Sequence, residues 1–121
     1  MLLTANAFEA HPPGIFQGEV TRIEQDQSKF DGKDQLVFTV RTTPLYGEKI
    51  ERSILYWTST SFSPQSKLGS VYMALSGEEV NAGLTVDTEN FLHQQALVEV
   101  ENYTRQDGQT GSRISAWKPS S

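Results

Sequence analysis

The sequence contains no cysteine among its 121 residues. This absence excludes disulfide bridges, thiolate catalysis and cysteine-ligated zinc, and it gives no reason to expect an oxidising compartment. No apolar run approaches the roughly 20 residues that a membrane-spanning helix needs. The first residues, MLLTANAFEAHPPG, lack the basic start and the continuous apolar stretch of a signal peptide. We therefore expect a cytoplasmic protein that does not bind a membrane.

Recognisable catalytic motifs are also absent. The two histidines, His11 and His93, form no HxH or HxxxH pair, so we expect solvated side chains and no metal site. There is no GxSxG elbow, and no glycine-rich loop of the GxxxxGK[ST] or GxGxxG type for phosphates. The SxxK match that begins at Ser115 falls on an expected strand without its companion motifs, and chance explains it. We expect a protein that is not an enzyme and has no cofactor.

Basic residues are few. Ten lysines and arginines stand against 15 acidic residues, which gives a net charge of −5. That balance favours solubility and argues against broad, purely electrostatic binding to nucleic acid. The length suits one domain with a modest core. We expect residues 1–13, which end in His11-Pro12-Pro13, to form a flexible leader, and residues 14–119 to form the single domain.

The clearest structural signal runs from residue 57 to residue 77, WTSTSFSPQSKLGSVYMALSG. Ser63 is the predicted N-cap, and Pro64 follows at the first helical position, where a missing backbone N–H costs nothing. Gly77 is the expected left-handed stop. The apolar residues at helical spacing are Leu68, Val71, Tyr72 and Leu75. This pattern predicts a helix over residues 64–76 with one buried stripe.

Alternating apolar and polar residues predict strands on both sides of the helix, over residues 14–25, 35–43, 49–58, 96–103 and 112–118. Gly18, together with a break in the alternation at Arg22 and Ile23, predicts a bulge or a sharp bend in the first strand. Such a bend lets one strand serve both halves of a small barrel. The segment 88–93 can add one short turn. The element order indicates an all-β protein, a five-stranded OB-fold Greek-key barrel with one helix between strands three and four.

Aromatic and basic side chains occur near the expected turns and strand ends. Proteins that bind single-stranded nucleic acid combine stacking aromatic rings with cations that follow the phosphates. The candidates for that role are Lys29, Arg41, Arg52, Trp57, Tyr103, Arg105, Arg113 and Trp117. The alternative is that the aromatic residues belong to the core and the basic residues need no ligand. A shared concave face for Arg41, Arg52, Arg113 and Trp117 favours nucleic acid, whereas scattering among carboxylates favours a protein partner.

The central segment resembles a group of phage and prophage-type small OB-fold proteins related to single-stranded-DNA-binding proteins. The resemblance is carried by residues 57–68, WTSTSFSPQSKL, followed by Ala74-Leu75 and Gly77. It extends more loosely to residues 13–18, 96–100 and 118–119. It implies an OB barrel that holds single-stranded DNA in phage or mobile-element replication and recombination, without enzymatic activity.

Two departures from that pattern keep a second function open. Gly69 and Ser70 follow Lys67 and Leu68 where larger or more basic residues are expected, which weakens a phosphate contact from the helix. His93-Gln94-Gln95 stands in place of a G-K-x-like turn and so removes a lysine. The alternative is an OB-fold protein-interaction or assembly module that binds a protein partner or a second copy of itself, and no nucleic acid.

Overall fold

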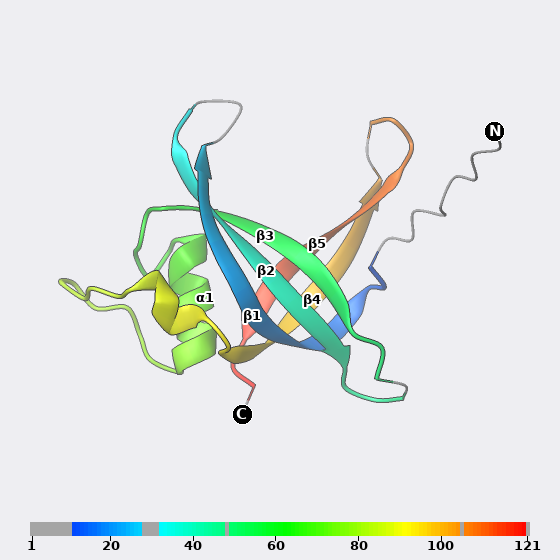
Figure 1. Cartoon of the computed structure of the whole chain (residues 1–121), viewed down its shortest axis with the longest axis horizontal. Helices are drawn as coiled ribbons and strands as arrows, with labels where there is room; N and C mark the ends of the chain where they lie inside the picture. Colours follow the sequence, from blue (N-terminus) through cyan, green and yellow to red (C-terminus); the bar gives the residue numbers. More distant parts are fainter. Residues whose placement is uncertain (1–10, 28–31, 48, 105, 121) are drawn as a thin grey trace.

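The computed structural model describes residues 11–27, 32–47, 49–104 and 106–120. Within these residues the chain forms one strongly curved antiparallel sheet of five strands, with one α-helix and a short 3-10 helix at one end (Figure 1). The elements are β1 (Gly14–Gln27), β2 (Asp34–Pro44), β3 (Arg52–Ser59), α1 (Lys67–Ser76), η1 (Thr88–Phe91), β4 (Gln95–Thr104) and β5 (Thr110–Lys118). The prediction of an all-β protein with a helix between strands three and four is confirmed. In the described part of the chain, no helix has the length and apolar character to cross a bilayer.

The first strand is shared between the two halves of the sheet. Its first residues, Gly14 to Glu19, pair with β4, and from Phe16 onward it also pairs with β2. The β1–β2 register shifts between Val20 and Arg22, so the predicted bulge is confirmed. A Cβ on Gly18 would lie only 3.0 Å from methyl groups of Val40 and Val98. The missing side chain therefore allows the close packing that the bend requires.

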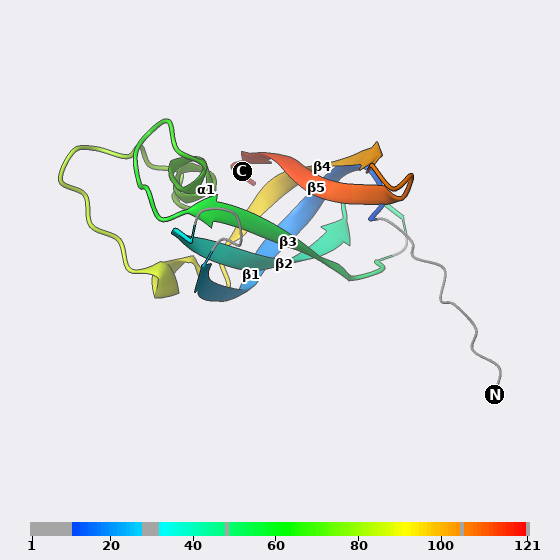
Figure 2. The same cartoon turned by 90° about the horizontal axis from the view of Figure 1, so that it is seen from above.

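The two edge strands face each other but are not paired. The strand order is β3-β2-β1-β4-β5, and in the described residues no ladder joins β3 to β5. Curling of the sheet brings these edges alongside each other (Figure 2), where the rings of Tyr56 and Trp117 pack at 5.4 Å. In the described residues the two edges therefore meet through side chains, without the backbone ladder that joins neighbouring strands. The sheet is therefore open along the β3–β5 seam and does not form the closed barrel of the sequence expectation.

The core lies inside the curl of the sheet and under α1, which contacts β3, β4 and β5. Three residues of the predicted helical stripe, Leu68, Val71 and Tyr72, are buried, whereas Leu75 is only partly buried. The sheet contributes Phe16, Val20, Leu36, Phe38, Val40, Ile54, Val98, Val100 and Ile114, and the long connection contributes Val80 and Phe91. The helix therefore covers one end of the curled sheet, next to the seam.

The helix begins later than the sequence predicts. Its N-cap is Ser66, whose hydroxyl accepts from the backbone N–H of Gly69 at 2.9 Å, so the prediction of Ser63 as the cap is wrong. Ser63 and Pro64 belong to a preceding turn, in which the Ser66 N–H donates to the Ser63 carbonyl oxygen at 3.1 Å. The predicted stop is confirmed: Gly77 has φ +74° and its N–H donates to Met73.

His11 is buried, so the expectation of a solvated side chain is wrong for this residue. Its Nδ1 lies 2.8 Å from the Pro12 carbonyl oxygen and its Nε2 lies 2.6 Å from Thr42 Oγ1. A neutral ring with its proton on Nδ1 satisfies both contacts, because Nε2 then accepts from the Thr42 hydroxyl. The ring also packs edge-on against Phe16 at 4.7 Å. These contacts fix His11, in the described part of the expected leader, against the sheet.

The burial of His11 predicts a pH dependence of stability. Desolvation lowers the pKa of His11 below its ordinary value of 6.5, the hydrogen bond to Pro12 opposes this, and the charge of Arg52 lowers the pKa further. Between the two pKa values the unfolded chain binds more protons than the folded protein, so the free energy of unfolding rises with pH. The contribution of His11 is complete above pH 6.5 and is lost as the pH falls toward the folded pKa.

We expect the His11→Gln variant to lose less stability than the wild type between pH 7.5 and pH 5.5, as measured by urea unfolding at each pH. Ordinary carboxylates, with pKa values near 4, titrate below this window. The comparison uses the change with pH within each protein, so a general destabilisation by the substitution does not affect it. Parallel profiles for the two proteins would show that His11 does not carry the effect.

Candidate nucleic-acid interface

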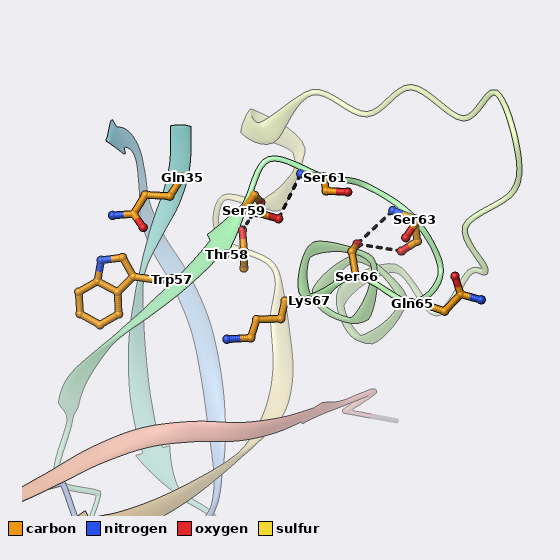
Figure 3. Close-up of a pocket in the computed structure, with 9 residues that line it drawn as sticks. All are labelled: Gln35, Trp57, Thr58, Ser59, Ser61, Ser63, Gln65, Ser66 and Lys67. Carbon is orange, nitrogen blue, oxygen red and sulfur yellow. Dashed lines mark hydrogen bonds between the residues drawn. The ribbon is translucent and has the colours of Figure 1, made fainter. Parts of the chain in front are cut away.

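Three contiguous hollows line the open β3–β5 seam and the adjoining start of α1. One, of about 510 Å³, lies between β5 and α1, and another, of about 190 Å³, lies between the outer parts of β3, β4 and β5. The third, of about 580 Å³, lies between the end of β3 and α1 (Figure 3). Lys67 lines all three, and Arg113 and Tyr56 line the first two. Together these hollows form the seam groove.

Two aromatic side chains present large exposed surfaces to the seam groove. Trp57 is 48% exposed on the outward face of β3, and Tyr103 is 37% exposed near the end of β4. Both line the hollow between the strands, and so does the exposed Leu55. Exposed rings beside an open groove can stack on the bases of a single strand.

The cations of the groove come from two different elements. Arg113 of β5 stacks over the Tyr103 ring at 5.5 Å and lies 3.6 Å from Glu101, an ion pair between two exposed groups that contributes little to stability. The Lys67 ammonium lies over the Tyr56 ring at 5.8 Å. In the described residues, no carboxylate pairs with Lys67. Its charge is therefore available to a ligand.

The floor of the groove is formed by Tyr56 and Trp117, which are partly buried against the core. Burial raises the pKa of Tyr56, and the Trp117 indole N–H beside its hydroxyl opposes that rise. The indole Nε1 is nevertheless buried and makes no well-formed hydrogen bond to the described residues. Because the Trp117 ring packs on Tyr56, it joins the two edge strands, and only part of its surface faces the hollow.

Arg41 lies elsewhere, on the outward face of β2. Its guanidinium donates to Glu19 at 3.0 Å, and the same carboxylate contacts Gln95 at 3.3 Å and His93 at 3.5 Å. Burial alone would raise the pKa of Glu19, but the hydrogen bonds from His93, Gln95 and Arg41 together with the charge of Arg41 outweigh it, so the pKa is lowered. This network uses the charge of Arg41 within the protein.

Arg52 also lies apart from the groove. It is the first residue of β3, five residues before Trp57, which corresponds to about 16 Å of extended chain. Its charge acts on His11. Lys29 and Arg105 lie outside the described residues, so the structure does not place them. Of the eight sequence candidates, Trp57, Tyr103, Arg113 and Trp117 come together. The shared concave face expected for Arg41, Arg52, Arg113 and Trp117 is not formed, because only Arg113 and Trp117 line one hollow. Arg41 and Arg113 each pair with a carboxylate, which is the arrangement that favours a protein partner.

Two of the aromatic and basic residues that line the groove were not among the sequence candidates, namely Lys67 and Tyr56. Lys67 stands in the SKL segment that begins the helix, where the following Gly69 and Ser70 argue against a phosphate contact. Tyr56 alternates with exposed residues of β3 and so belongs to the inward face. The sequence signal for Lys67 was its position directly after the segment that leaves β3. In the described residues, no group of three or more acidic residues or histidines could hold a metal ion.

The fold and the groove define a small antiparallel β-sheet protein with an aromatic and basic surface along an open seam. The chain belongs to the family described as Protein of unknown function (DUF669), which matches residues 4–121. No curated protein matches the chain.

Proposed function

We propose that this protein is a non-enzymatic, OB-like barrel that binds single-stranded DNA in phage or mobile-element replication or recombination. The observation that carries the proposal is the seam groove, in which exposed Trp57 and Tyr103 lie beside Arg113 and Lys67. Stacking rings interleaved with cations are the combination that single strands require.

The topology supports the same proposal. The strand order β3-β2-β1-β4-β5, with a helix between β3 and β4, agrees with the element order of an OB fold, although β3 and β5 meet here only through side chains such as Tyr56 and Trp117. The bulged first strand, which is shared by both halves, also fits this plan. The resemblance of residues 57–68 to phage-type single-stranded-DNA-binding proteins adds to it.

The charge distribution sets the expected strength of binding. The chain carries a net charge of −5, and in the described part of the protein only Lys67 and Arg113 contribute cations to the groove. Few phosphates are then neutralised, so stacking carries much of the affinity. We expect modest affinity at physiological ionic strength and binding that weakens as salt is added.

The test is a titration of the intact protein with fluorescently labelled oligo-dT, followed by anisotropy at several salt concentrations. We expect saturable binding at about 20 mM salt, where counterion release is most favourable, together with quenching of tryptophan emission. A folded protein that fails to bind oligo-dT at that salt would contradict the proposal. The protein-interaction or assembly module would then be favoured, and sedimentation would show whether the partner is a second copy.

A further inference from the structure

The pocket at the exit of β3 is rich in hydroxyl and amide groups and holds one charge. Its lining comes from β2, the end of β3, the connecting turn and the start of α1, as Figure 3 shows. Trp57 and Gln35 lie on one side of β3, where the indole ring points away from α1. The serines of the turn form the rim, and Lys67 extends from the start of α1 toward the other side of β3. At about 580 Å³, the pocket falls within the range of about 300–1,000 Å³ that is typical of small-ligand sites.

Only some of the polar side chains that line this pocket make hydrogen bonds within the described part of the protein. Ser66 is fully used, because its hydroxyl accepts from Ser63 and Gly69 and donates to the Ser63 carbonyl. Thr58 is also used, since its hydroxyl donates to Ser59. The side chains of Gln35, Ser61 and Gln65 line the same space and have no hydrogen-bond partner among the described residues. They are available to a polar ligand.

We infer that this pocket binds one nucleotide of the single strand, with its base stacked on Trp57 and its phosphodiester group against Lys67. This inference rests on the proposed function and specifies where one end of the bound segment lies. One phosphodiester carries one negative charge, which matches the single cation in the pocket. The free hydroxyl and amide groups of Ser61, Gln65 and Gln35 then face the sugar and the edge of the base.

The position of Lys67 connects the pocket to the rest of the groove. The same side chain lines the hollows that lead to Arg113 and Tyr103, so a strand leaving the pocket continues along the seam. The outward face of β2 offers less, because Arg41 is already paired with Glu19 at 3.0 Å. The bound strand therefore follows the open seam and ends in the pocket.

The experiment compares Lys67→Gln with Lys49→Gln, which makes the same charge change before the opposite end of β3 and outside the pocket lining. We expect Lys67→Gln to weaken oligo-dT binding on the order of tenfold, as for loss of a charged hydrogen bond. The slope of log affinity against log salt should become shallower by about 0.7. Lys49→Gln should change neither value, and Lys67→Arg should restore both. Thermal melts establish that each variant is folded.

A spectroscopic reading locates the nucleotide. Trp117→Phe keeps a ring against Tyr56 and leaves Trp57 as the only tryptophan of the chain. Quenching of this emission on oligo-dT binding is expected. Binding with unchanged emission, and with Lys67→Gln equal to Lys49→Gln, would overturn the inference while leaving the proposed function intact. Failure of the wild-type protein to bind at all would overturn both.

Discussion

Gly69→Ala is expected to lower the free energy of unfolding by about 1–3 kcal/mol, the typical cost of overpacking a buried site. In an ordinary helix this change stabilises by up to about 1 kcal/mol, because alanine loses less backbone entropy than glycine. Here the added Cβ would lie 1.9 Å from the Ser63 carbonyl oxygen and 2.9 Å from its carbon. These are backbone atoms that cannot rotate away, so either the turn or the helix must shift.

The Ser63 carbonyl is also fixed by its own partners, the backbone N–H and the hydroxyl of Ser66, at 3.1 Å and 2.9 Å. The measurement is thermal or urea unfolding, with Ser70→Ala as the matched control at the next, exposed position of the same helix. That control should be close to neutral. An increase in stability for both variants would show that the turn at residues 63–66 does not pack on the helix.

The same residues show why the ends of the helix were unequally predictable. The stop depends on one residue, because glycine adopts φ +74° at little energetic cost, and the prediction of Gly77 is confirmed. At the start of the helix, residues 58–66 contain several serines and threonines that could each act as the N-cap, and the local sequence does not distinguish between them. Ser66 caps the helix because its hydroxyl joins the turn to the first helical turn, and Gly69 leaves room for that turn.

The strands and the bulge could be predicted because alternation and a central glycine are properties of single segments. The closure of the sheet could not, because it depends on how far the whole sheet curls. That curl brings Tyr56 to Trp117 across 61 positions of sequence, with a ring distance of 5.4 Å, and leaves the edges unpaired. The burial of His11 has a similar origin, since its partner Thr42 lies 31 residues away.

The residues of the candidate site also divide into those that a single segment predicts and those that depend on contacts between distant segments. Trp57 and Tyr103 could be predicted as exposed rings near strand ends, and Arg113 reaches Tyr103 through the hairpin register of β4 and β5. Lys67 enters the groove from the start of α1, next to the seam, and no strand pattern indicates this position. Arg41 lies opposite Glu19 in the β1–β2 ladder, and that register depends on the bulge. Pairing across strands therefore decides which basic residues are available to a ligand.

Trp57→Ala is expected to give the largest loss of affinity for single-stranded DNA. Removing one stacking ring costs about 1–3 kcal/mol of binding free energy, which raises the dissociation constant roughly 5- to 150-fold. The ring is 48% exposed and outside the core, so stability should change little. The salt dependence should stay the same, because stacking releases no counterions. Anisotropy of labelled oligo-dT measures this without relying on the lost tryptophan.

Tyr46→Ala is the matched control, since Tyr46 is 90% exposed in the turn after β2 and lines none of the three hollows of the seam groove. It should bind as the wild type does, and Trp57→Phe should keep part of the affinity because a ring remains. Trp117→Ala differs again: it removes a ring packed on Tyr56, so it should lower stability as well as affinity. Equal affinities for Trp57→Ala and Tyr46→Ala would mean that DNA, if bound, takes a path that avoids the seam groove. A loss confined to Trp57→Ala, at unchanged melting temperature and salt slope, requires a base to rest on that indole, because a structural role would change the melting temperature and a phosphate contact would change the slope.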